Sequence, residues 1–218
     1  MRDRDLVRLY WPAELKPAFD ALFAVDDALA EVVTSSTQPA LGAIRLAWWR
    51  EALERLDSKP PPPEPRLQAA ARELLPRGIS GRELARLEVG WSALLEPFPD
   101  DDLTMEQVAE RGTVFFQMAS TLIANANKQI DQAGALWGLT NAARQSVDWP
   151  TRTHLFLHAE EALARLCSHR FDRRVRPLTA LAGLAARDAK KGEFNIEPEA
   201  TPGRALVLLR HRITGRIA

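Results

Sequence analysis

The sequence predicts an all-α protein, folded as one helical bundle over residues 1–218, and three observations support this fold class. Alanine occurs 34 times and leucine 30 times, against 17 valines and isoleucines together. Alanine and leucine lose little conformational freedom in a helix, whereas β-branched residues lose more. Apolar residues recur at helical steps along most of the chain, and no stretch alternates as a half-buried strand would. The third observation is a series of proline and capping signals between these segments.

The N-terminal half of the chain contains five predicted helices, most of them with a local start or stop signal. Pro39 opens the second helix, because a proline is tolerated in a first helical turn. Ser80 and Glu83 have the spacing of a capping box, and so do Thr104 and Gln107, which predict the start of the fifth helix. The predicted ranges are 13–33, 39–56, 66–75, 81–96 and 104–126.

The C-terminal half contains four more predicted helices. Trp149 and Pro150 mark a break between two of them. Thr201 before Pro202 predicts an N-cap followed by a proline at the first helical position. The predicted ranges are 129–147, 150–170, 176–190 and 202–215.

A proline-rich segment, residues 59–65, contains five prolines among seven residues and indicates a stiff, extended loop. It is either a loop inside one domain or a boundary between two. The 58 residues before it form only a helical hairpin, which would bury too little apolar surface to be stable alone. We therefore expect a surface loop within a single domain.

The charge balance and the cysteine content exclude several classes of function. Lys and Arg together (29) equal Asp and Glu together (29), so a general nucleic-acid-binding protein is not expected. A single cysteine, Cys167, excludes an intramolecular disulfide framework and a zinc cluster of paired cysteines. Apolar runs are too short to span a bilayer, and the charged N-terminus is unlike a signal peptide. We expect a cytoplasmic protein.

Three acidic residues on the first long helix form a candidate metal site. Asp26 and Asp27 are adjacent, and Glu31 lies one turn after Asp27 on the same face. Mg²⁺ at such sites takes one or two carboxylates together with phosphate oxygens of a substrate. The alternative is a solvated acidic face that binds nothing.

The helix that begins at Pro39 carries the most distinctive pattern. Its predicted buried face consists of Leu41, Ile44, Trp48, Ala52 and Leu53. Trp48 is therefore expected in the core. Trp49 lies about 100° further around the helix, beside Arg45, and is expected to pack on a neighbouring helix or to line a cavity. Arg45 would reach one of the two rings as a cation–π pair.

The stretch from Tyr10 to Leu56, which includes this helix, resembles the squalene/phytoene synthase family of head-to-head prenyl synthases. Members commonly carry strings similar to Ala21-Leu-Phe-Ala-Val25, to Leu41-Gly-Ala-Ile-Arg45 and to Trp48-Trp49-Arg50-Glu-Ala-Leu53. Further similar positions are Gly112, Leu139-Thr140-Asn141 and Arg144. The resemblance implies a single bundle of the isoprenoid-synthase type around a central cavity.

The resemblance also implies where the catalytic residues of the family should lie, and these positions have diverged. Active members hold Mg²⁺ and two prenyl diphosphates with two aspartate-rich motifs on opposite cavity walls. The first motif would fall at residues 30–34, where Glu31 is the only acid, with Asp26 and Asp27 one turn earlier. In the second motif Gln145 replaces the first aspartate, and Asp148 lies one residue from the position of the second.

A single glutamate on one wall cannot hold the metal cluster that ionises a diphosphate. The chain is similar to the diverged branch of the family that includes a mitochondrial complex I assembly factor. This resemblance implies a protein without prenyl transferase activity or cofactor, which binds an isoprenoid or lipid, or acts with a protein partner in membrane-complex assembly. One alternative is an active Mg²⁺-dependent prenyl transferase that condenses prenyl diphosphates through the shifted acids Asp26, Asp27 and Glu31. The other is an unrelated helical interaction module, in which the two tryptophans only pack in the core and no large central cavity is expected.

The candidate residues of the cavity or of the remnant diphosphate site come from all of these segments. They are Asp26, Asp27, Glu31, Arg45, Trp49, Asn141, Arg144, Gln145 and Asp148. Because Gln145 replaces its expected acidic neighbour, Arg144 is predicted to pair with another acid or to face water. Glu31 and Asp27, across the cavity, are the acids we expect it to reach.

The last predicted helix, within residues 202–216, is a candidate for peripheral contact with a membrane or a partner. Leu206, Leu209 and Ile213 form one apolar stripe. Arg204, Arg210, Arg212 and Arg216 surround this stripe with positive charge. A helix of this kind binds anionic lipid through its apolar area and its basic residues. The alternative is that the stripe packs on the bundle, and the arginines could then still face lipid.

Overall fold

The computed structural model describes residues 2–95, 102–123, 128–166 and 169–217, and within them the chain is all-α, as predicted. The helices of the N-terminal half are α1 (Asp3–Arg8), α2 (Lys16–Ser35), α3 (Pro39–Arg55), α4 (Pro65–Glu73), α5 (Gly81–Ala85) and α6 (Leu87–Ser92). Those that follow are α7 (Asp102–Leu122), α8 (Lys128–Gln145), α9 (Trp149–Ala164), α10 (Arg176–Lys191) and α11 (Pro202–Thr214). Three short 3₁₀ turns occur at Ala13–Leu15, Leu75–Arg77 and Glu193–Asn195.

Several helix ends follow the local signals in the sequence. The Ser80 hydroxyl accepts a hydrogen bond from the Glu83 amide, and the Glu83 carboxylate accepts one from the Ser80 amide, as a capping box requires. Thr201 caps α11 by accepting from the Arg204 amide. Thr104, in contrast, lies inside α7 and does not begin it. Helix α1 was not predicted, and Cys167 lies outside the described residues.

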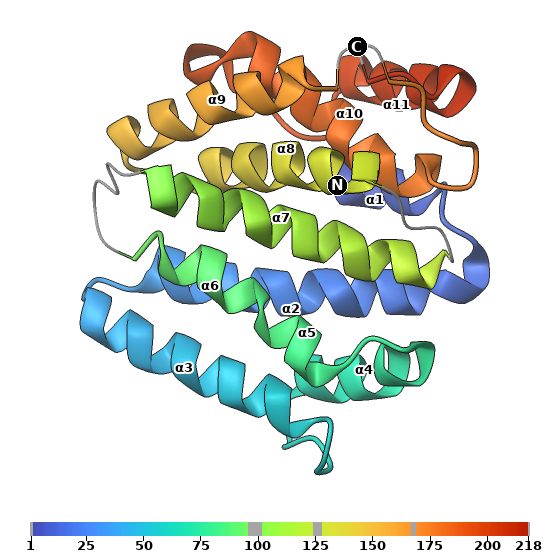
Figure 1. Ribbon diagram of the computed structural model, residues 1–218. Helices are drawn as coiled ribbons and strands as arrows, with labels where there is room; N and C mark the ends of the chain where they lie inside the picture. The colour runs from blue at the N-terminus through green and yellow to red at the C-terminus, as the bar shows by residue number, and fades with distance from the viewer. Residues whose placement is uncertain (1, 96–101, 124–127, 167–168, 218) are drawn as a thin grey trace.

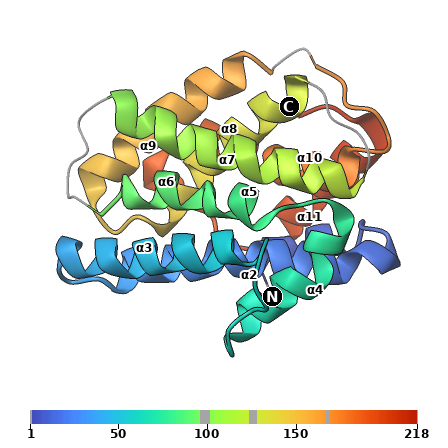
Figure 2. The same ribbon diagram turned by 60° about the horizontal axis from the view of Figure 1, so that its bottom comes forward.

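Helices α7 and α8 run side by side through the middle of the bundle (Figure 1). Glycines allow this close approach, because a Cβ atom on Gly112 would lie 2.1 Å from the carbonyl oxygen of Gly134. Gly138, one turn after Gly134, meets Gly112 in the same way. Helices α2 and α6 pack on one side of this pair, and α9 and α10 on the other. The outer helix α3 lies against α5 and α6 (Figure 2).

Aromatic side chains connect α2 with the central helix pair. The ring centroids of Trp11 and Phe19 lie 4.7 Å apart, and those of Phe19 and Phe23 also 4.7 Å. Phe23 contacts Phe115 of α7 at 4.8 Å, and Phe115 contacts Trp137 of α8 at 4.6 Å. Tilted and edge-on pairs of this kind contribute about 0.5–1.5 kcal/mol each beyond the area that they bury. The series holds α2 at a defined distance from α8.

The face of α3 that packs on the bundle differs from the predicted one. Leu41, Ile44 and Trp48 are 54 %, 66 % and 49 % exposed, whereas the buried residues are Gly42, Leu46, Trp49, Ala52 and Leu53. The prediction that Trp48 lies in the core is therefore wrong, and the burial of Trp49 is confirmed. Gly42 explains the difference: its missing side chain admits Leu95, whose Cδ2 would lie 2.5 Å from a Cβ at this position.

Helix α11 also presents an unexpected face to the bundle. Its buried residues are Arg204, Leu208 and His211, while the stripe of Leu206, Leu209 and Ile213 points outward. The expectation that this stripe packs on the bundle is wrong. Arg204 takes the inward position because buried carboxylates neutralise its charge there.

Helix α4 follows the proline-rich loop and packs against α2, which precedes the loop. Leu67, Ala70 and Leu74 are fully buried in this contact region and belong to the main core. The segments before and after the loop thus share one hydrophobic core.

Candidate functional site

A charged cleft of about 370 Å³ opens between α1, α2, α8 and α10. Its apolar part is formed by Phe23 of α2, Trp137 of α8 and Leu181 and Leu184 of α10. The polar part consists of Arg2, Asp3, Arg4, Asp26, Asp27, Thr140, Asn141, Arg144, Gln145, Asp188, Glu199 and Arg204. The cleft therefore combines an apolar wall with a rim of charges of both signs.

Five of the predicted candidate residues line this cleft. They are Asp26, Asp27, Asn141, Arg144 and Gln145. The aromatic contacts between α2 and α8 bring these two stretches together, although more than 100 residues separate them in the sequence. Two adjacent acids of α2 and three polar residues of α8 thus face one cleft.

The other four candidates lie elsewhere. Glu31 is 65 % exposed and pairs with Arg66 of α4 at 2.7 Å. Arg45 is exposed and donates to the Ser35 hydroxyl, and Trp49 is buried with its ring edge-on to Trp48. Asp148 caps α9, because its carboxylate accepts from the Thr151 amide at 2.9 Å. These residues do not contribute to the cleft.

Asp26 is neutralised by a residue that sequence analysis missed, Arg111 of α7. Arg111 Nη1 lies 2.7 and 2.8 Å from the two carboxylate oxygens of Asp26, and both side chains are buried. The indole of Trp91 donates to Asp26 Oδ1 at 2.9 Å, and the Arg111 guanidinium lies 4.1 Å from the centroid of the same indole. A signal was present, because Arg111 falls between Val108 and Phe115 on the apolar stripe of α7.

The second guanidinium nitrogen of Arg111 continues the network toward α8. It donates to the carbonyl oxygen of Gly138 and to Asn141 Oδ1, both at 3.1 Å. The side-chain amide of Gln145 donates to the same Asn141 oxygen at 3.1 Å. Arg111 thereby orients Asn141 directly, and Asn141 in turn orients Gln145.

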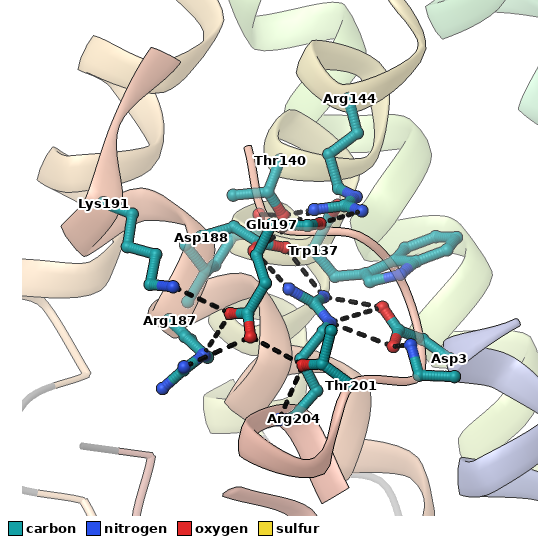
Figure 3. A network of polar contacts seen from close by, with 12 residues as sticks. Asp3, Trp137, Thr140, Arg144, Arg187, Asp188, Lys191, Glu197, Thr201 and Arg204 are labelled. Atoms are coloured by element: carbon teal, nitrogen blue, oxygen red, sulfur yellow. Dashed lines mark hydrogen bonds and ion pairs between the residues drawn. The ribbon is translucent and has the colours of Figure 1, made fainter. Parts of the chain in front are cut away.

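Arg204 is the centre of a second group of buried charges in the cleft lining (Figure 3). Its Nε lies 2.9 and 2.8 Å from the two oxygens of Asp3, and its Nη2 lies 2.9 Å from Asp188 Oδ2. Burial alone would lower the pKa of Arg204, but the hydrogen bonds to Asp188 and Asp3 outweigh it and raise this pKa above its ordinary value. Arg204 thus bridges the carboxylates of Asp3 and Asp188.

Arg144 pairs with an acid, as predicted, but not with Glu31 or Asp27. Its Nη1 lies 3.3 Å from Asp188 Oδ1, an ion-pair distance, yet this nitrogen is buried and makes no hydrogen bond. Its Nη2 donates to the carbonyl oxygen of Glu197 at 2.9 Å. The predicted partners are wrong because Asp27 is engaged at the mouth of the cleft and Glu31 lies outside it. Nη1 of Arg144 is therefore a buried donor whose hydrogen-bonding capacity is not satisfied.

The loop between α10 and α11 is held by Glu197 (Figure 3). Its carboxylate accepts from Arg187 at 2.6 Å, from Lys191 at 2.9 Å and from the Thr201 hydroxyl at 2.6 Å. The hydrogen bonds from Arg187, Thr201 and Lys191, in that order, hold the pKa of Glu197 well below its usual range. This loop positions the Glu197 carbonyl that receives Arg144.

The mouth of the cleft is formed by the N-terminal segment. Arg4 forms an ion pair with Asp27, and Arg2 Nη1 lies 3.4 Å from the same carboxylate. The Arg4 guanidinium also lies 5.5 Å from the centroid of Phe23. Two arginines thus stand at the entrance, where solvent reaches them.

Within the described residues, no group of three or more His, Cys, Asp or Glu side chains could hold a metal ion. Asp3, Asp26, Asp27 and Asp188 all line the cleft, and each contacts an arginine. Chemically, the cleft can offer guanidinium donors to an anion and an apolar wall to a chain attached to it.

In comparisons with known proteins, no family model, no curated protein and no solved structure matches the chain. The structure defines an all-α bundle with a cleft whose buried acids are neutralised by arginines. None of the helices in the described part of the chain is both long enough and apolar enough to cross a bilayer.

Proposed function

We propose that this protein is a diverged squalene/phytoene synthase-like protein that binds an isoprenoid or related lipid in the charged cleft and does not transfer prenyl groups. The observation that supports this most strongly is the ion pair between Asp26 and Arg111. Asp26 is the buried carboxylate of α2 that would be expected to bind a metal ion in a prenyl transferase. In this protein it forms an ion pair with Arg111 instead.

A prenyl transferase must stabilise the diphosphate that leaves, and metal ions held by carboxylates supply most of that charge. To bind a metal, Asp26 would have to give up Arg111, which would leave a buried guanidinium without its counterion. Loss of one partner of a buried ion pair costs about 3–5 kcal/mol. Asp188 faces the same difficulty with Arg204.

The cleft suits an amphipathic anion instead. Its volume of about 370 Å³ falls within the usual range for small-molecule sites. Arg2, Arg4 and Nη1 of Arg144 would contact the anionic head, and Phe23 and Trp137 would contact the chain. A role in the assembly of a membrane complex with a protein partner is compatible with such binding.

One observation favours a second candidate, an active Mg²⁺-dependent prenyl transferase. Asp26 and Asp27 of α2 line the same cleft as Asp188 of α10 and Asp3 of α1, so acids do stand on two walls. Against this candidate, Glu31 points to Arg66, and the four aspartates of the cleft each contact an arginine. In this second function the arginines would have to move when substrate and Mg²⁺ bind.

The decisive experiment is incubation of the purified protein with farnesyl or geranylgeranyl diphosphate, with and without Mg²⁺, followed by product analysis and by titration of tryptophan fluorescence. We expect saturable binding without Mg²⁺ and no product. Formation of a cyclopropyl intermediate or of phytoene, or of squalene when NADPH is added as the hydride donor, would establish the second candidate in place of the first.

Variants locate the binding site. Arg144→Gln is expected to weaken binding about tenfold or more, as for the loss of one charge-assisted hydrogen bond. Arg45→Gln, at an exposed arginine outside the cleft, is the matched control and should bind as the wild type does. Equal affinities of both variants would remove the cleft as the binding site.

A further inference from the structure

Helix α11 carries an outward apolar ridge that no part of the described chain covers. Leu206, Leu209 and Ile213 are 65 %, 49 % and 66 % exposed. The opposite face of the helix is firmly seated, since Arg204, Leu208 and His211 are buried at about 1 % exposure each. The ridge therefore belongs to a helix with a fixed orientation, and rotation of α11 could not hide it.

A cationic groove of about 240 Å³ runs along one flank of this ridge, between α10 and α11. Its floor is apolar, formed by Gly183, Ala186, Val207 and Ile217. Its walls are Arg187, Lys190, Lys191, Arg210 and Arg216, with no acid among them. Glu197 engages Arg187 and Lys191, and the exposed side chains of Lys190 and Arg216 add further positive charge to the groove.

A second cationic groove, also of about 240 Å³, lies on the other flank. Arg173, Arg176 and Arg212 line it together with Tyr10, whose ring centroid lies 4.8 Å from the Arg212 guanidinium. Residues 201–218 contain four arginines and no acid. The ridge thus has positive charge on both sides, and Figure 1 places α11 at the periphery of the bundle beside α10.

We propose that α11 is the surface by which the protein docks on an anionic lipid bilayer. Leu206, Leu209 and Ile213 enter the boundary between headgroups and acyl chains, and Lys190, Arg210 and Arg212 lie at the level of the lipid phosphates. A flat anionic surface can contact both flanks of the ridge at once. Nucleic acid would use the arginines but would leave the ridge in water, so the charge and the apolar area together favour lipid.

The chain offers an internal control on α3. Leu41, Ile44 and Trp48 have the same helical spacing as the α11 ridge and comparable exposure. The neighbouring charges differ, because α3 carries Glu51 and Glu54 as well as its arginines. If apolar exposure alone caused binding, both ridges would bind membranes equally.

The test is cosedimentation of the full-length protein with phosphatidylcholine vesicles, with and without phosphatidylserine, at low and high salt. The ridge variant is Leu206→Ser/Leu209→Ser/Ile213→Ser, the charge variant is Arg210→Glu/Arg212→Glu, and the control is Leu41→Ser/Ile44→Ser. Circular dichroism establishes that each is folded, which is expected because the changed side chains are exposed.

We expect binding to the anionic vesicles that weakens at high salt, and a loss of about tenfold or more in the ridge and charge variants. The control variant should bind as the wild type does. Absence of wild-type binding at low salt would overturn the proposal, and so would a control variant that binds as weakly as the ridge variant. A wild type that is dimeric in size-exclusion chromatography, with a monomeric ridge variant, would show that a second copy covers the ridge instead.

Discussion

Arg111 and Asp26 neutralise each other in the core, with Nη1 of the arginine 2.7 Å from one carboxylate oxygen and 2.8 Å from the other. The pair connects α7 with α2 across 85 residues of sequence. Trp91 donates to the carboxylate and stacks under the guanidinium, so the charges are enclosed by protein atoms. Asp26 therefore serves the packing of the bundle, and its charge is not available to solvent.

Asp26→Asn should destabilise the protein by about 3–5 kcal/mol, because it leaves the buried Arg111 cation without a counterion. Urea denaturation at neutral pH measures this loss. The control is Asp27→Asn at the neighbouring, partly exposed carboxylate, where we expect about 1 kcal/mol or less. Similar losses in both variants would mean that Arg111 finds another partner when Asp26 is changed.

Gly112→Ala should disrupt the contact between α7 and α8. The new Cβ would lie 2.1 Å from the Gly134 carbonyl oxygen, which belongs to the backbone and cannot swing away. We expect a loss of about 3 kcal/mol or more in thermal or urea denaturation. Gly183→Ala on α10 is the matched control.

At Gly183 the nearest atom to the added methyl group is the Cβ of His211 at 3.8 Å, an ordinary contact. Alanine also has the higher helix propensity, by about 1 kcal/mol. Gly183→Ala should therefore be neutral or stabilising. A control variant that is as unstable as Gly112→Ala would contradict the assignment of the effect to the helix crossing.

The two adjacent tryptophans of α3 should differ in their contribution to stability. Trp49→Ala removes a buried ring and should cost about 3–5 kcal/mol. Trp48→Ala removes a ring that is 49 % exposed and should cost markedly less, about 1 kcal/mol. Denaturant unfolding of both variants checks the orientation of α3, and a reversed order of the two values would show that the helix is rotated.

Stability should decrease as the pH falls below 6.5, because His211 is buried in its neutral form. Burial is the main effect, and it lowers the pKa of His211 below the unfolded value of 6.5. The hydrogen bond to the Arg216 carbonyl opposes this shift, whereas the positive charge of Arg176 lowers the pKa further. The unfolded chain then binds more protons between the two pKa values, so acidification favours unfolding. The contribution of His211 is fully present above the unfolded pKa and is lost as the pH falls through the folded pKa.

Urea unfolding of the wild type and of His211→Asn, followed from about pH 7.5 down to about pH 5.5, measures this effect. The ring nitrogen Nδ1 donates to the Arg216 carbonyl at 2.9 Å, and asparagine can supply a donor there without titrating. We expect the stability of the variant to depend less on pH in this range. Parallel curves for the two proteins would contradict the assignment to His211.

The local signals in the sequence determined the helices themselves. The capping box at Ser80 and the N-cap at Thr201 act through backbone groups three residues away, so their effect does not depend on the rest of the fold. The all-α class could also be predicted from the sequence. Each residue's helix propensity is a weak signal, but composition and helical periodicity indicate helix in every segment, so the sum is informative. Asn141, Arg144 and Gln145 lie together for a similarly local reason, since they follow one another on one helix that lines the cleft.

Tertiary structure alone decided which face of each outer helix is buried and which charges meet. On α3, two faces of similar periodicity compete, and the close approach of Leu95 to Gly42 selects the one with Trp49. On α11, Arg204 turns inward because Asp3, 201 residues away, and Asp188 meet it there. A charge pair across such distances depends on the packing of several helices, and a buried charge is stable only when that packing supplies its partner. The ion pairs of Asp26 and Arg144 also join residues of different helices. Their partners could therefore be identified only from the tertiary structure.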